Sequence, residues 1–108
     1  MNGNTYDYHV TAVNAVGAAI ESYVSYAAGT LTESTDLALF APSGAAVARI
    51  DLLRTSLDNT VPLTVDVPVP AGEEVRLVDL LGVTFGHSGT GALRITALSG
   101  EVLASSQT

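Results

Sequence analysis

Turn-forming residues divide this chain into short segments, and this punctuation limits the possible fold more than any other feature. Ten glycines and four prolines are spread along 108 residues, between runs rich in valine, leucine, alanine and threonine. Apolar and β-branched runs of about four to eight residues, bounded by such turn signals, are typical of β-strands. The sequence therefore predicts an all-β chain. The predicted strands are 5–13, 20–28, 35–40, 45–55, 61–69, 73–78, 92–98 and 102–106.

The first predicted strand has the clearest alternation in the chain. Because strand side chains point alternately to opposite faces, Tyr6, Tyr8 and Val10 share an apolar face. The opposite face is polar and carries Asp7 and His9. We expect the apolar face to pack against a core.

The predicted strands fall into two groups. Those within 1–28 are joined by a short turn and would form an antiparallel hairpin, residues 29–34 would be a linker, and 35–108 would form a small antiparallel sandwich. The expected fold class is therefore all-β, an antiparallel β-sandwich with an N-terminal β-hairpin. Asp79 would cap the candidate helix at 79–86, whose apolar side chains would plug one end of the sandwich.

The stretch NTYDYHVTAVNAVG (residues 4–17) resembles the sixth strand of a fibronectin type III domain and the turn after it. Residues 20–28 then resemble the seventh and last strand. Tyr6 matches the tyrosine-corner position, whose hydroxyl ties the chain to backbone upstream. The resemblance covers residues 1–28 and implies a terminal hairpin cut from a longer multidomain protein.

The rest of the chain resembles an uncharacterised β-module that is repeated in large secreted bacterial proteins. The residues that carry this resemblance are TDLALF (35–40), DLLG (79–82), GAL (91–93) and ASS (104–106). It implies an extracellular or cell-surface location for the parent protein and no established activity. Met1 is followed directly by Asn2-Gly3-Asn4, so we expect this chain to carry no signal peptide.

The charge balance excludes several classes of partner. Eleven acidic residues, four arginines and no lysine give a net charge of −7. Nucleic acid is excluded because its phosphate backbone requires a cationic surface. Anionic membrane surfaces are disfavoured, and no apolar run is long enough to span a bilayer. Without cysteine the chain has neither disulfides nor zinc sites built on thiolates.

The best candidate for a metal site joins Asp7, His9 and His87. Asp7 and His9 are two residues apart on one strand, which puts their Cα atoms roughly 6–7 Å apart on the same face. Glu21 on the next strand would approach them. A Zn²⁺ ion held by two or three such ligands, with one position open, would activate water. The alternative is that His9 and His87 are ordinary polar surface residues.

Other sequence features point less specifically to chemistry. Gly86-His87-Ser88-Gly89-Thr90-Gly91 departs from the Gly-x-Ser-x-Gly elbow of hydrolases, and a β-rich run follows it instead of a helix. The remaining carboxylates are scattered and form no calcium-binding loop. Alternation puts Tyr23 and Tyr26 on opposite faces of their strand, which argues against a shared carbohydrate-binding platform.

Two functions follow from these observations. The first is a non-catalytic structural or interaction module of a secreted bacterial multidomain protein, with a protein partner and no cofactor. The second is a small Zn²⁺-dependent hydrolase of esters or phosphoesters, with its site assembled at a subunit interface. Both include a homo-oligomer formed through the N-terminal hairpin, because exchange of the hairpin between protomers would cover its unpaired edges and apolar face.

Overall fold

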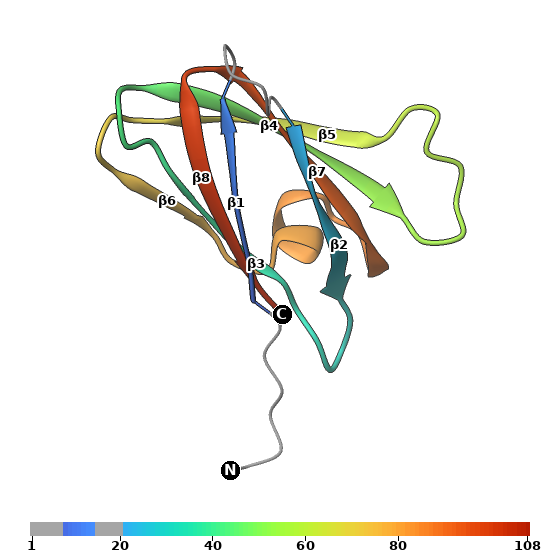
Figure 1. Ribbon diagram of the computed structural model, residues 1–108. Helices are drawn as coiled ribbons and strands as arrows, with labels where there is room; N and C mark the ends of the chain where they lie inside the picture. The colour runs from blue at the N-terminus through green and yellow to red at the C-terminus, as the bar shows by residue number, and fades with distance from the viewer. Residues whose placement is uncertain (1–7, 15–20) are drawn as a thin grey trace.

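The computed structural model describes residues 8–14 and 21–108 of the chain, and Val13 is the residue of 8–14 whose side chain is described. Eight strands form two packed sheets in this part of the chain, which also contains one short helix (Figure 1). The elements are β1 (Tyr8–Asn14), β2 (Glu21–Gly29), β3 (Asp36–Phe40), β4 (Ala46–Arg54), β5 (Leu63–Val69), β6 (Glu74–Leu77), η1 (Leu80–Thr84), β7 (Gly89–Ser99) and β8 (Glu101–Gln107).

Each sheet has four strands. Sheet A has the order β1-β8-β3-β6 and sheet B the order β2-β7-β4-β5, and all of these strands pair in antiparallel fashion. The predicted fold class, an all-β antiparallel sandwich, is therefore confirmed. The strands also lie close to their predicted positions, because glycine, proline and short polar residues end each of them.

The predicted pairing of the two N-terminal strands is wrong. β1 pairs with β8 in sheet A, from Tyr8 opposite Gln107 to Asn14 opposite Glu101. β2 pairs with β7 in sheet B instead. This division buries Val13 and Val24 in one core from opposite sheets, whereas a hairpin standing apart from the sandwich would leave such side chains in water.

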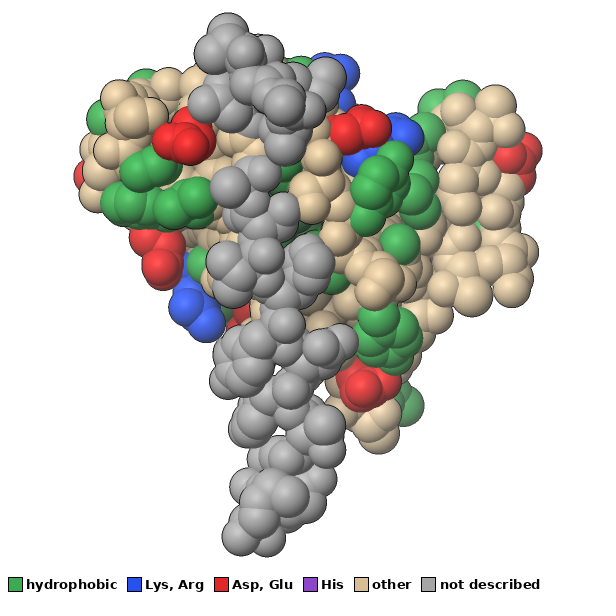
Figure 2. All heavy atoms as spheres, viewed as in Figure 1, with side chains coloured by type: hydrophobic (Ala, Val, Ile, Leu, Met, Phe, Trp, Pro, Cys, Tyr) green, Lys and Arg blue, Asp and Glu red, His purple; other side chains and the backbone are tan. Residues whose placement is uncertain are grey.

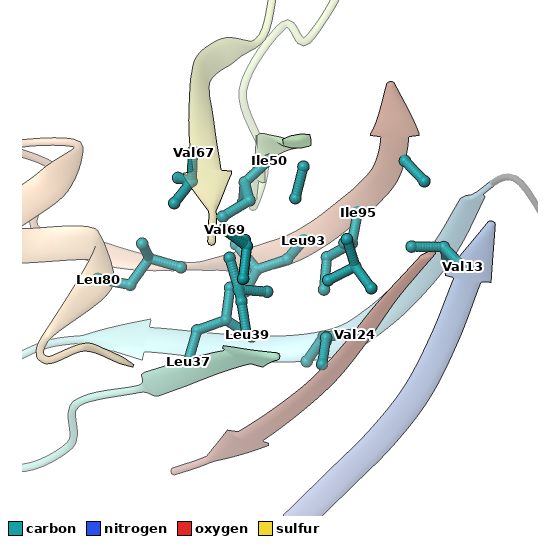
Figure 3. Packing of buried hydrophobic residues seen from close by; sticks show 14 of the residues in the cluster. Val13, Val24, Leu37, Leu39, Ile50, Val67, Val69, Leu80, Leu93 and Ile95 are labelled. Atoms are coloured by element: carbon teal, nitrogen blue, oxygen red, sulfur yellow. The ribbon is translucent and has the colours of Figure 1, made fainter. Parts of the chain in front are cut away.

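The core lies between the two sheets. Leu37 and Leu39 of β3 point into it from sheet A, and Ile50 of β4 and Ile95 of β7 face them from sheet B (Figure 3). All four side chains are fully buried. Val13 is also buried. It lies outside the set Tyr6, Tyr8 and Val10 that was predicted to form the apolar face of the first strand. That set begins with Tyr6, which lies outside the described residues.

The helix η1 closes one end of the sandwich. It is a single π-helical turn, and its Leu80 and Leu81 are fully buried, as the sequence predicted for a plug. The predicted capping by Asp79 is wrong, because its side chain makes no capping hydrogen bond. Asp79 has a left-handed backbone (φ 50°), and its N–H instead donates to a carboxylate oxygen of Asp36 at 2.9 Å.

The predicted linker at 29–34 is a tight turn between sheets B and A. The N–H of Thr30 donates to the carbonyl oxygen of Glu33 at 2.8 Å, and Gly29 forms an isolated bridge with Ser34. This turn brings β3 back across the core from β2. The division of the chain into 1–28, 29–34 and 35–108, as parts of a longer protein, stays a prediction.

Candidate functional site

The outer face of sheet B carries a row of polar side chains that crosses all four strands. The register places Tyr23 of β2 opposite Arg94 of β7, Arg94 opposite Asp51 of β4, and Asp51 opposite Thr64 of β5. Residues directly opposite each other in an antiparallel pair share a face and lie close together. These four side chains therefore form one continuous row.

Asp51 anchors this row. It is 5% exposed, although it belongs to the outer face, because its neighbours cover it. The Nε of Arg94 donates to Asp51 Oδ2 at 2.9 Å, and the hydroxyl of Thr64 donates to Asp51 Oδ1. A buried carboxylate is costly unless it is paired and hydrogen-bonded, so these contacts hold the three side chains in one arrangement.

Arg94 joins this anchor to Tyr23. The hydrogen bond to Asp51 is the main reason why the pKa of Arg94 is raised, and the nearby Tyr23 adds a smaller contribution. The side chain of Tyr23 is 48% exposed. Tyr23 thus lies at the exposed end of the row, next to Arg94 in the register.

A second row lies beside the first. Glu21 of β2, Thr96 of β7, Arg49 of β4 and Asp66 of β5 lie opposite one another in the same order. Arg49 donates to both carboxylate oxygens of Asp66, at 2.8 and 3.1 Å. This bidentate pair raises the pKa of Arg49 and lowers that of Asp66. Both side chains are exposed, so the pair sets geometry more than it adds stability.

A β-bulge adds a second tyrosine to this face. The register of β2 against β7 shifts between Val24 and Ala27, so that Ser25 and Tyr26 together oppose Ala92. The predicted placement of Tyr23 and Tyr26 on opposite faces is therefore wrong, because a bulge resets strand alternation. Tyr26 is 38% exposed, whereas Val24 and Ala27 on either side of the bulge are buried.

The hydroxyl of Tyr26 is also held in place. It donates to Oε1 of Glu33, in the turn after β2, at 2.7 Å. This hydrogen bond is the main reason why the pKa of Tyr26 is raised, and the negative charge of Glu33 adds to it. The phenol is therefore neutral across the physiological range, and its ring orientation is tied to the turn.

The residues of the predicted metal site are described to different extents. Asp7 lies outside the described residues. His9 lies opposite Ser106 in sheet A, and its side chain is not among those described. Glu21 lies in sheet B, so the hairpin pairing that would have set it beside His9 is absent. The convergence of Asp7, His9 and His87 on a metal stays a prediction.

His87 lies in an open pocket at the η1 end of the sandwich. Among the described residues no group of three or more histidine, aspartate or glutamate side chains is arranged to hold a metal ion. Ser88 is the serine of the stretch that was compared with the hydrolase elbow. It is followed directly by β7 and not by a helix. The pocket is lined by Gly29, Thr30, Leu31, Asp79, Gly82, Gly86, His87 and Ser88.

Sequence reasoning missed Asp79 as a neighbour of His87 in this pocket. Its carboxylate lies against Gly82, where an added Cβ would come 2.7 Å from Oδ2. One carboxylate and one imidazole are fewer protein ligands than catalytic zinc sites use. The rows on sheet B have the more completely fixed side chains and are therefore the better candidate site.

In comparisons with known proteins, no family model, no curated protein and no solved structure matches this chain. Within the described residues, no helix is long and apolar enough to cross a membrane. The function is therefore inferred from the chain's own residues.

Proposed function

We propose that this chain is a non-catalytic interaction module of a secreted bacterial multidomain protein, and that it binds a protein partner through the outer face of sheet B. The observation that carries this proposal is the row from Tyr23 through Arg94 and Asp51 to Thr64. Tyrosine and arginine are enriched among residues that dominate binding energy at protein interfaces. Here both occur on one sheet face with defined partners.

Pre-organisation supports this proposal. Association costs free energy for each side chain that becomes ordered at the interface. The hydroxyl of Tyr26 is already held by Glu33, and Tyr23 lies beside an Arg94 that is fixed by its pair with Asp51, so these side chains lose little freedom on binding. A flat, rigid face of this kind suits recognition better than it suits a reaction, which requires groups that converge on one atom.

Homo-oligomerisation through the N-terminal strands is part of the proposal. β1 and β2 pair with β8 and β7 of their own chain. Exchange between protomers would set the same strands against β8 and β7 of a second copy, without new contacts. Light scattering after size-exclusion chromatography tests this, and a monomeric mass over a wide range of concentrations would contradict it.

The binding face is tested by NMR titration of isotope-labelled protein with surface proteins and polysaccharides from a bacterial cell envelope. We expect chemical-shift changes centred on Tyr23, Arg94 and Tyr26. Tyr23→Ala should reduce them, whereas Phe40→Ala, which removes a similarly exposed ring from sheet A, should not. Shift changes confined to sheet A or to the His87 pocket would overturn the proposal.

Hydrolysis of activated esters and phosphoesters, measured with and without added Zn²⁺, separates this function from the zinc hydrolase. We expect no rate above buffer. A rate that chelation removes, and that His87→Ala also removes, would replace the proposed function with the enzymatic one.

A further inference from the structure

We propose that the partner presents a cationic extended segment, whose lysine or arginine side chains lie along β2. This inference rests on the proposed function and names the chemistry of the partner. The receiving surface, here called the β2 strip, consists of Glu21, Tyr23, Tyr26 and Glu33. All four side chains are exposed. Figure 2 shows hydrophobic side chains along β2, with acidic side chains near both ends of this strip.

The charges on sheet B make the strip negative. Arg94 is paired with Asp51 and Arg49 with Asp66, so the arginines beside the strip are already neutralised. Within the described residues, no salt bridge reaches Glu21 or Glu33. The strip therefore carries two carboxylates that form no salt bridge within the described residues, on a chain whose net charge is −7.

The carboxylate of Glu33 is prepared for a cation. Tyr26 donates to its Oε1, which leaves Oε2 free to accept a hydrogen bond from an ammonium or guanidinium group. The raised pKa of Tyr26 keeps that phenol a donor, so the tyrosine does not add a competing negative charge.

The two tyrosines supply the remaining contacts. A cation over the face of an exposed tyrosine is attracted by the ring quadrupole, and the aliphatic stem of lysine or arginine packs on the same ring. Both rings are on the outer face because the bulge at Ser25 and Tyr26 resets alternation. Glu21, Tyr23 and Tyr26 thus follow one another along β2, and Glu33 follows in the turn after it.

The dimensions of the strip fit an extended segment. Because of the bulge, Glu21 and Tyr26 lie opposite Thr96 and Ala92 of β7, four residues apart, which is roughly 13 Å at the usual strand rise. A partner strand that places every second side chain on one face repeats at roughly 7 Å. Two or three cationic side chains in alternation would therefore reach the strip together. Among the described strands, β2 is the edge strand of sheet B and pairs only with β7, so its other edge has no strand partner there.

The probes are three soluble ligands of similar size: an arginine–serine repeat peptide, a glutamate–serine repeat peptide and a neutral β-glucan oligosaccharide. Each is titrated into labelled protein at low and high salt. We expect the arginine peptide alone to shift the amide signals of β2, with affinity that falls as salt rises because exposed charges are screened.

Conservative variants test which groups bind. Glu21→Gln and Glu33→Gln keep shape and hydrogen bonding while removing charge, and each should weaken the arginine peptide roughly two- to fivefold. Tyr23→Leu and Tyr26→Leu should have effects of about the same size. Glu74→Gln on β6 is the matched control and should leave affinity unchanged. Thermal unfolding of each variant establishes that it is folded.

The outcomes separate this inference from the function on which it rests. Binding of the oligosaccharide or the acidic peptide at the β2 strip, without the arginine peptide, would overturn the cationic partner and leave a binding face on sheet B. Binding of the arginine peptide that is equal in all four strip variants would place it elsewhere and overturn this inference. Shift changes that never involve sheet B would overturn both.

Discussion

Arg94 and Asp51 form an ion pair between adjacent strands of sheet B, with 2.9 Å between Arg94 Nε and Asp51 Oδ2. The side chain of Asp51 is 6% exposed and that of Arg94 is 32% exposed. The carboxylate is therefore the partner that depends on the pair, since the guanidinium retains access to water.

This asymmetry predicts unequal effects of substitution. Arg94→Ala leaves a buried carboxylate with Thr64 as its remaining partner, and we expect it to lower the free energy of unfolding by about 2–3 kcal/mol. Asp51→Asn keeps one oxygen to accept from Arg94, and its NH2 group can donate to the Thr64 hydroxyl after that hydroxyl rotates, so it should cost about 1 kcal/mol. Urea unfolding of both variants measures the difference. Equal losses would contradict the assignment of Asp51 as the dependent partner.

The Arg49–Asp66 pair predicts an acid-dependent contribution to stability. Hydrogen bonding to Arg49 lowers the pKa of Asp66 in the folded state. Such a group stabilises the fold above the unfolded aspartate pKa, which is about 3.9, and the contribution is lost as pH falls through the folded value. The stability difference between wild type and Asp66→Asn should therefore shrink below about pH 4.

The matched variant for this pH test is Arg49→Gln, which removes the same interaction from the other side. Its stability difference from wild type should shrink over the same acid range as that of Asp66→Asn. If the difference for either variant were constant from neutral pH into acid, the pair would have no linkage to protonation.

Gly91 of β7 predicts a strong steric effect, because it lies between β2 and β4 in sheet B. A Cβ at this position would lie 2.5 Å from the carbonyl oxygen of Leu53 and 3.0 Å from a methyl of Leu52. Gly91→Ala should therefore destabilise the fold by about 1–3 kcal/mol through overpacking. Thr90→Ala removes an exposed hydroxyl contact with Thr55 and should change stability by less than about 0.5 kcal/mol. Thermal or urea unfolding measures both.

The plug formed by η1 predicts a contrast between two of its residues. Leu80→Ala removes a fully buried side chain and should cost about 2–5 kcal/mol. Val83→Ala acts on a side chain that is 75% exposed and should be near neutral. A small loss for Leu80→Ala would mean that the end of the sandwich is stabilised without the plug.

Local patterns in the sequence were sufficient to locate the described strands. Gly100 shows why, since its backbone φ of 70° is one that glycine adopts at little cost and it separates β7 from β8. The same reasoning predicted the plug, because the apolar residues Leu80 and Leu81 lie in a short segment between β6 and the turn at Gly86.

The candidate site was less accessible to sequence reasoning. Nothing in the local pattern around Val24 signals a bulge, so alternation separated Tyr23 from Tyr26. The row through Arg94 joins residues of four strands that are far apart in sequence, and its existence depends on register. The positive φ of Asp79 was likewise missed, because left-handed backbone is uncommon for residues other than glycine.

The sequence by itself determined the secondary structure and the fold class, because turn chemistry and strand propensity act over a few neighbouring residues. The tertiary structure alone decided the partners of β1 and β2 and the face on which Tyr26 lies. Those outcomes depend on which strand edges and which core positions remain open after the other strands have packed. Burial of Val13 and Val24 between the sheets favours the division of the two strands, which no local pattern encodes.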